Sequence, residues 1–224
     1  MKISNFEQKN FLDEVNLFLI WILPIGLVVG SLVVNILILL IISIFLLNRI
    51  LKKETYIFKN KFLYFLYFIW IYLIFVSTIN IENFDTKDQD SIIRSVGFIR
   101  YVFLSFAIGY YIKKFSNEKI LIFWVLIFLI VTIDLIFEFY NGSNLLGFKS
   151  NYHGRLAGFT GEELKIGGLY FGFVLLTISF IFQKKNTLIF PMAILFILVS
   201  LLIGERANFV KVLFVILIGT FLID

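Results

Sequence analysis

Long apolar stretches separated by short charged segments constrain this chain more than any other feature of its sequence. The stretches are 15–47, 62–78, 91–112, 120–140, 166–183, 187–203 and 207–223. A helix needs about 20 residues to cross the hydrocarbon core of a bilayer, and lipid offers the backbone no partners outside the helix. With 60% hydrophobic and 16% charged residues, the chain is too apolar for an ordinary soluble domain. We therefore predict an all-α integral membrane protein, a polytopic helical bundle forming a single transmembrane domain over residues 1–224.

The first stretch, 15–47, is too long for one upright helix. A straight helix of that length measures about 50 Å, against a hydrocarbon core of about 30 Å. A helical hairpin turning near Gly30 gives about eight transmembrane helices, whereas one steeply tilted helix gives seven. Residues at which the helix can break are Pro24, Gly26, Gly30 and Ser31.

The charges between the apolar stretches predict an orientation. Lys and Arg gather in 48–61, 113–119 and 184–186, whereas 79–90 is mostly acidic. Because basic loops stay in the cytoplasm, 79–90, 141–165 and Gly204–Ala207 are expected on the opposite, non-cytoplasmic side. The hairpin alternative also places the basic N-terminus in the cytoplasm, so we favour eight helices. The net charge of +5 is spread over the connections, so the expected partner is the lipid bilayer, with no nucleic acid.

Two polar segments on the non-cytoplasmic side are candidate sites. The loop 141–165 is rich in turn-forming residues and contains Arg155, and Arg206 interrupts two apolar helices. A guanidinium group suits the phosphate oxygens of an anionic lipid. Equally, Arg206 can be an interfacial anchor or a partner for Glu205, and Arg155 can be an ordinary loop cation. The acids Glu162 and Glu163 can simply cap the following helix.

Arg100 and Asp134 lie inside apolar stretches, where a charge is costly unless it is paired or faces a polar cavity. Counted from the outer ends of their helices, Arg100 is about 13 Å deep and Asp134 about 10 Å deep. We expect the two to join helices across an internal cavity, either as structural glue or as cavity-lining residues. Other charges within apolar stretches are Arg94, Glu138 and Lys211.

The order of several segments resembles the O-antigen ligase and O-antigen polymerase family of polytopic bacterial inner-membrane glycosyltransferases. The segments are LPIGLVVGSLVVNILILL (Leu23–Leu40), VTIDLIFEFYNGSNLLGF (Val131–Phe148), GRLAGFTGEEL (Gly154–Leu164) and IGERANF (Ile203–Phe209). The resemblance implies transfer of an undecaprenyl-diphosphate-linked glycan to a hydroxyl of an acceptor glycan or lipid A-core at the periplasmic face, in cell-surface polysaccharide biosynthesis. It also implies that Arg155 and Arg206 hold the diphosphate, with no metal ion or other cofactor.

The sequence departs from this family in one respect. The resemblance covers only the N-terminal and middle part of the family. Its members have further helices and a large periplasmic loop that bears the catalytic histidine, and this sequence holds no such loop, so the transfer reaction requires that loop to be supplied elsewhere. The histidine present, His153, lies two residues before Arg155 and does not occupy the expected position. Glu163 is therefore the candidate for the base. The alternative function is a non-catalytic component that binds or transports a lipid-linked saccharide.

Overall fold

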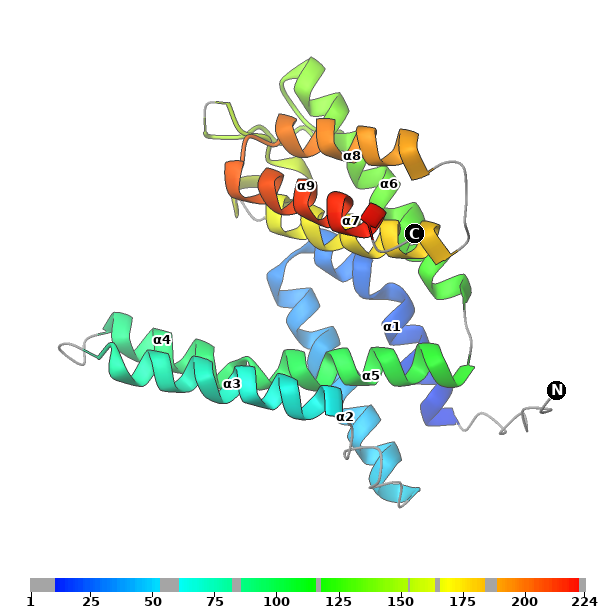
Figure 1. The fold of residues 1–224 in the computed structure, drawn as a ribbon, viewed down its shortest axis with the longest axis vertical. Helices are drawn as coiled ribbons and strands as arrows, with labels where there is room; N and C mark the ends of the chain where they lie inside the picture. Colours follow the sequence, from blue (N-terminus) through cyan, green and yellow to red (C-terminus); the bar gives the residue numbers. More distant parts are fainter. Residues whose placement is uncertain are drawn as a thin grey trace. The chain divides into compact units, whose positions relative to one another are not determined.

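The part of the chain that the structure describes is mostly helical (Figure 1). The computed structural model describes residues 11–52, 61–81, 86–115, 118–152, 154–163, 166–183 and 189–221, and these ranges contain no strand. This agrees with the predicted all-α class. The elements are α1 Phe11–Val29, α2 Ser31–Leu51, α3 Lys61–Ile79, α4 Thr86–Gly97, α5 Ile99–Phe115, α6 Glu118–Asn141, the 3₁₀ helix η2 Gly158–Glu163, α7 Ile166–Gln183, α8 Ile189–Leu202 and α9 Arg206–Phe221.

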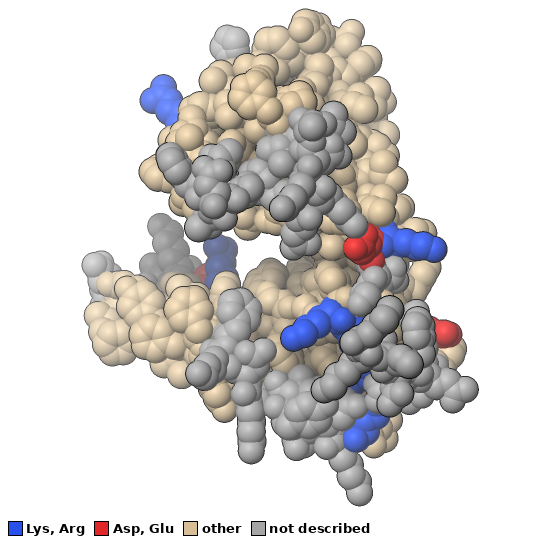
Figure 2. Space-filling view, turned by 45° about the vertical axis from the view of Figure 1, so that its right-hand side comes forward, with Lys and Arg blue, Asp and Glu red and all other residues tan. Residues whose placement is uncertain are grey.

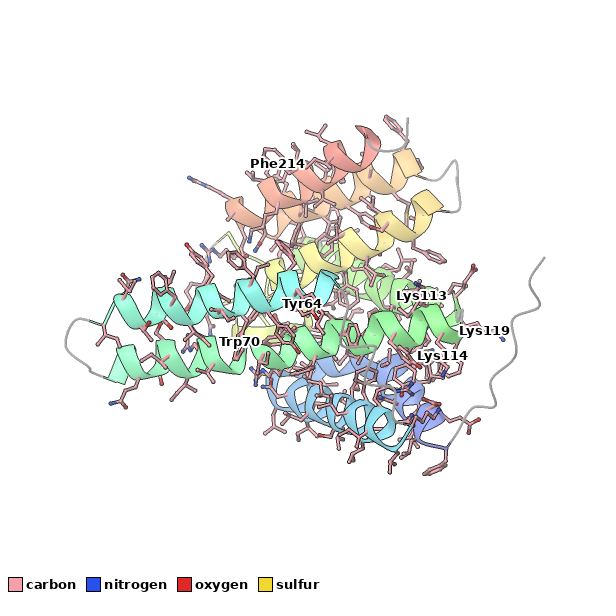
Figure 3. The ribbon with its side chains drawn as sticks, turned by 60° about the horizontal axis from the view of Figure 1, so that its bottom comes forward. Tyr64, Trp70, Lys113, Lys114, Lys119 and Phe214 are labelled. Atoms are coloured by element: carbon pink, nitrogen blue, oxygen red, sulfur yellow. The ribbon has the colours of Figure 1, made fainter. Side chains whose placement is uncertain are left out.

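Four of the described helical segments are long and apolar enough to cross a membrane: Phe11–Val29, Ser31–Leu51, Gln89–Phe115 and Glu118–Asn141. Three shorter apolar helices cover Leu63–Ile79, Ile166–Ile181 and Phe190–Leu202. The described surface carries few charges in the view of Figure 2, and large apolar side chains such as Tyr64 and Phe214 are exposed (Figure 3). These features are those of a helical membrane protein. The total of eight spans stays a prediction.

The contacts divide the chain into two compact units, and each is described by itself. The first unit comprises Met1–Leu23 and Leu32–Asn117, and the second comprises Pro24–Ser31 and Glu118–Asp224. The prediction of a single transmembrane domain is not tested by this division.

The long first stretch forms two helices. Helix α1 ends at Val29 and α2 begins at Ser31, and Gly30 between them has a φ of 146°, a conformation that side chains with a Cβ rarely adopt. Hydrogen bonds join the two helices: the Asn16 side chain donates to the carbonyl of Ile41, and Arg49 donates to the carboxylate of Asp13. The chain therefore doubles back on itself. This is the arrangement that the hairpin alternative predicts.

The predicted stretch 91–112 differs in detail, because it is interrupted at Phe98. Helix α4 ends at Gly97 and α5 begins at Ile99. The interruption withdraws the carbonyl of Val96 from a continuous helical ladder, and the indole Nε1 of Trp70 on α3 donates to it at 3.2 Å (Figure 3). Helix α3 packs on both α4 and α5. Residues 86–90, predicted as part of a loop, form the first turn of α4.

The second unit is built around α6, α7, α8 and α9. Helix α7 packs on α9, α8 and α6, and η2 packs on α6 and α7. The buried ring of Phe128 on α6 lies at its centre, with the ring centroids of Tyr170, Phe173 and Phe196 at 4.9, 5.5 and 5.0 Å. Because α6 ends at Asn141 and α7 begins at Ile166, this core carries the predicted 141–165 loop at one end.

Candidate functional site

The loop after α6 is held against that helix by buried side chains. Gly142 ends the helix with a φ of 72°, and its N–H donates to the carbonyl of Glu138 at 2.8 Å. The Glu138 carboxylate accepts the backbone N–H groups of Ala157 at 2.9 Å and Gly158 at 2.7 Å. One turn earlier, Oδ1 of Asp134 accepts the N–H of Leu145 at 2.8 Å. The loop is therefore packed onto α6 at both of its ends.

Asn144 links the two ends of this loop directly. Its side chain is buried, and its Oδ1 accepts the N–H groups of Leu146 at 3.1 Å and Phe148 at 2.8 Å. Its Nδ2 donates to the carbonyl of Gly158 at 2.7 Å. An asparagine that satisfies backbone groups on both sides of a turn fixes its conformation.

The second half of the loop lies against the connection between α8 and α9. The N–H of Leu156 donates to the carbonyl of Ile203 at 3.3 Å. A Cβ added at Gly204 would lie 2.3 Å from the carbonyl oxygen of Gly154, and Gly204 has a φ of 80°. Only a glycine fits both the conformation and the close approach at this position.

This contact brings Arg155 and Arg206 to one cavity of about 740 Å³, which is lined by Gly154, Arg155, Gly204, Glu205, Arg206 and Ala207. Both arginine side chains are exposed. Within the described part of the chain, neither arginine forms an ion pair. Two guanidinium groups at the rim of one cavity form a site suited to an anion.

The start of α9 adds to the positive character of the cavity. Arg206 is the first residue of α9, and the leading N–H groups of a helix lack partners within the helix and form its positive end. The half-buried Glu205 carboxylate is bonded to the amide of Asn208. A Cβ at Gly167 on α7 would meet this carboxylate, so the glycine makes room for the Glu205–Asn208 pair.

Arg155 and Arg206 are thus the two predicted site residues that the structure brings together. Arg100 donates to the hydroxyl of its neighbour Tyr101 at 3.1 Å, and Asp134 binds the loop backbone as described. These two residues belong to different units, so their pairing stays a prediction. His153 and the side chain of Glu163 lie outside the described residues.

Sequence reasoning did not assign a role to Glu138 or Asn144. Glu138 stands out in the sequence as an acid within an apolar stretch, and such a residue is expected to have a specific partner. That partner is a pair of backbone N–H groups, which leave no signature in the sequence. Glu205, which the sequence offers as a partner for Arg206, is bonded to Asn208.

No protein-family model matches the chain, and neither a curated protein nor a solved structure does.

Proposed function

We propose that the chain binds an undecaprenyl-diphosphate-linked glycan in the cavity of Arg155 and Arg206, and takes part in transfer of that glycan to an acceptor hydroxyl. The observation that carries the proposal is that two arginines 51 residues apart (206 minus 155) line the same cavity. The apolar helices suit the polyprenyl tail, and the resemblance of the Gly154–Leu164 and Ile203–Phe209 segments to O-antigen ligases and polymerases supports the same substrate. The proposed location is the bacterial inner membrane, with the cavity facing the periplasm.

The arginine pair suits the chemistry of such a transfer. When the anomeric C–O bond breaks, negative charge develops on the leaving diphosphate, and two guanidinium groups at the cavity stabilise that charge. The acceptor hydroxyl loses its proton to a base. We keep Glu163, the candidate from the sequence, as the proposed base. Its side chain lies outside the described part of the structure.

Binding without turnover is the second candidate function. Glu205 is the carboxylate among the described residues that line the cavity. Because Glu205 is already bonded to Asn208, it is not available as a base, and this favours binding alone. A saccharide-binding or transport component needs the arginine pair and no base. Release of undecaprenyl diphosphate in the presence of an acceptor glycan separates the two functions, because only the enzyme produces it.

The first test is binding of an undecaprenyl-diphosphate oligosaccharide to the purified chain in detergent. We expect Arg155→Ala and Arg206→Ala each to weaken binding by about 1.5–3 kcal/mol, as for a charge-assisted hydrogen bond. Lysine at either position should recover only part of the affinity, because its ammonium group lacks the planar fork of arginine.

Lys149→Ala is the matched control, because Lys149 is an exposed cation of the same loop that does not line the cavity. We expect it to bind as tightly as the wild type. If the wild-type chain does not bind, or if both alanine variants bind like the control, the arginines are interfacial anchors and the proposed function is wrong.

A further inference from the structure

Helix α6 carries two buried carboxylates on one face, and neither of them lines the cavity of the proposed site. Asp134 and Glu138 are four residues apart, so they lie one above the other on the helix, with exposures of 0% and 3%. Within the described ranges, neither forms an ion pair. Burying a carboxylate is costly unless its charge is balanced by hydrogen bonds. The backbone of the 141–165 loop supplies them to both oxygens of Glu138, but only to Oδ1 of Asp134, whose Oδ2 has no partner among the described residues.

Glu138 makes the more specific of the two contacts. Its Oε1 accepts the N–H of Ala157 and its Oε2 accepts the N–H of Gly158, so both oxygens are used by successive residues. The carbonyl of Gly158 is held from the other side by Asn144. Gly158 has a φ of 55°, and a Cβ there would lie 3.1 Å from Ile166 and Leu135. The Ala157–Gly158 segment is therefore fixed in position and in conformation.

This peptide lies next to the arginine of the proposed site. Arg155 precedes Ala157 by two residues, and the intervening Leu156 is bonded to Ile203. On its other side, Gly154 packs against Gly204. The backbone of Arg155 thus runs between an anchor on the α8–α9 connection and an anchor on Glu138, while its own side chain is exposed at the cavity.

We infer that Glu138 is a positioning residue, which sets the place of the Arg155 guanidinium in the cavity and so the affinity of the site for a diphosphate. The inference rests on the proposed function. Glu138 does not contact the ligand. It acts by holding the Ala157–Gly158 N–H groups, which a flexible loop would leave to water. Without this anchor, the Leu156–Ile203 bond and the Gly154–Gly204 contact still hold the Arg155 backbone, but its guanidinium group is less well placed in the cavity while the helices keep their packing.

The test substitutes Glu138→Gln and measures binding of an undecaprenyl-diphosphate oligosaccharide in detergent. Glutamine has one acceptor oxygen, so one of the two backbone N–H groups loses its partner. We expect binding to weaken about tenfold, the effect of leaving a buried donor unpaired. Asn141→Ala on the same helix is the control, because the Asn141 side chain is exposed and, among the described residues, bonds only the carbonyl of Phe137. It should bind like the wild type.

A double-mutant cycle with Arg155 separates positioning from general loss of structure. If Glu138 acts through Arg155, then Glu138→Gln has no further effect on binding once Arg155 is alanine. A tenfold loss in both backgrounds would overturn the inference, because the carboxylate would then be acting on the whole site. Glu138→Asp is the milder second variant: it keeps the charge, but its shorter side chain cannot reach both N–H groups, so binding should weaken in the same way.

The failures of the two proposals are distinguishable. If Arg155→Ala leaves binding unchanged, the proposed function fails whatever Glu138 does. If Arg155→Ala weakens binding and neither Glu138 variant does, the positioning role fails and the proposed function stands. Misfolding of both Glu138 variants would also overturn the inference, because the carboxylate would then hold the fold of the unit instead of one loop segment.

Discussion

Gly204 is the residue at which the two arginine-bearing segments come into contact. It has a φ of 80°, and an added Cβ would lie 2.3 Å from the carbonyl oxygen of Gly154 and 3.3 Å from Cγ of Arg155. A left-handed conformation costs a residue with a Cβ about 1–2 kcal/mol. The overlap with a backbone carbonyl cannot be relieved by turning a side chain, so the Gly154–Arg155 segment has to move.

We therefore expect Gly204→Ala to lower the free energy of unfolding by about 1–2 kcal/mol from the backbone conformation alone. The change is measured as a lower midpoint of thermal unfolding in detergent. It should also weaken binding of the diphosphate lipid about as much as Arg155→Ala does. Gly109→Ala is the matched control, because Gly109 lies within α5 with nothing within 4 Å of an added Cβ. Equal midpoints and equal binding for the two variants would contradict the close contact at Gly204.

At the scale of single residues, the sequence predicted the arginine pair and missed what supports it. Arg155 and Arg206 could be proposed because a cation beside an apolar stretch is conspicuous and because the surrounding segments resemble a known family. The roles of Glu138 and Asn144 depend on backbone groups of Ala157 and Gly158. Every residue type carries such groups, so no pattern of side chains could reveal which ones are bound.

Three helices of the first unit meet at a buried cluster around Asp13. Its Oδ1 accepts bonds from Asn48 at 2.6 Å, Arg49 at 3.0 Å and Tyr111 at 3.1 Å, and Lys52 lies 2.8 Å from Oδ2. Arg49 is fully buried and lies with its Cζ 4.4 Å from the ring centroid of Tyr110. The start of α1, the end of α2 and the end of α5 are therefore joined by one carboxylate.

Removing that carboxylate leaves a buried guanidinium group without its counter-charge. We expect Asp13→Asn to destabilise the chain by about 3–5 kcal/mol, measured as a lower thermal midpoint in detergent. The combination of Asp13→Asn with Arg49→Met should cost less than the sum of the two single changes, because it removes both charges.

Glu14→Gln is the control for the Asp13 cluster, since Glu14 is exposed in the same turn of α1. It should leave the free energy of unfolding within about 0.5 kcal/mol of the wild type, and the thermal midpoint nearly unchanged. An Asp13→Asn variant as stable as this control would show that the ion pair contributes nothing to the packing of these helices.

At the scale of elements, local signals predicted the breaks that are encoded locally. Gly30 separates α1 from α2, and the turn-rich loop follows Asn141, both as the sequence indicates. The interruption at Phe98 was missed, because 91–112 contains no proline and its one early glycine, Gly97, is compatible with a continuous helix. The carbonyl freed there is bound by Trp70, a residue on another helix, and long-range compensation of this kind cannot be deduced from a local pattern.

For the whole molecule, the helical class followed from composition, because lipid permits few other structures. The charges of the connecting segments predict the orientation. Helix α6 has 24 residues, so it is about 36 Å long and exceeds the hydrocarbon core of about 30 Å. Its two ends should lie on opposite sides of the membrane, with the basic end in the cytoplasm.

The chain contains no cysteine, so single cysteines can report this orientation without background. Lys119 lies in the first turn of α6 (Figure 3), and Lys149 lies in the loop that follows the end of α6. Both side chains are exposed. In spheroplasts of a bacterial expression host, we expect Lys149→Cys to react with a membrane-impermeant maleimide from outside, and Lys119→Cys to react only after permeabilisation. Reaction of both from outside would mean that α6 does not cross the membrane. The reverse pattern would place the cavity of Arg155 and Arg206 in the cytoplasm, where a periplasmic glycan donor could not reach it, and would exclude the proposed transfer reaction even if the purified chain binds the diphosphate.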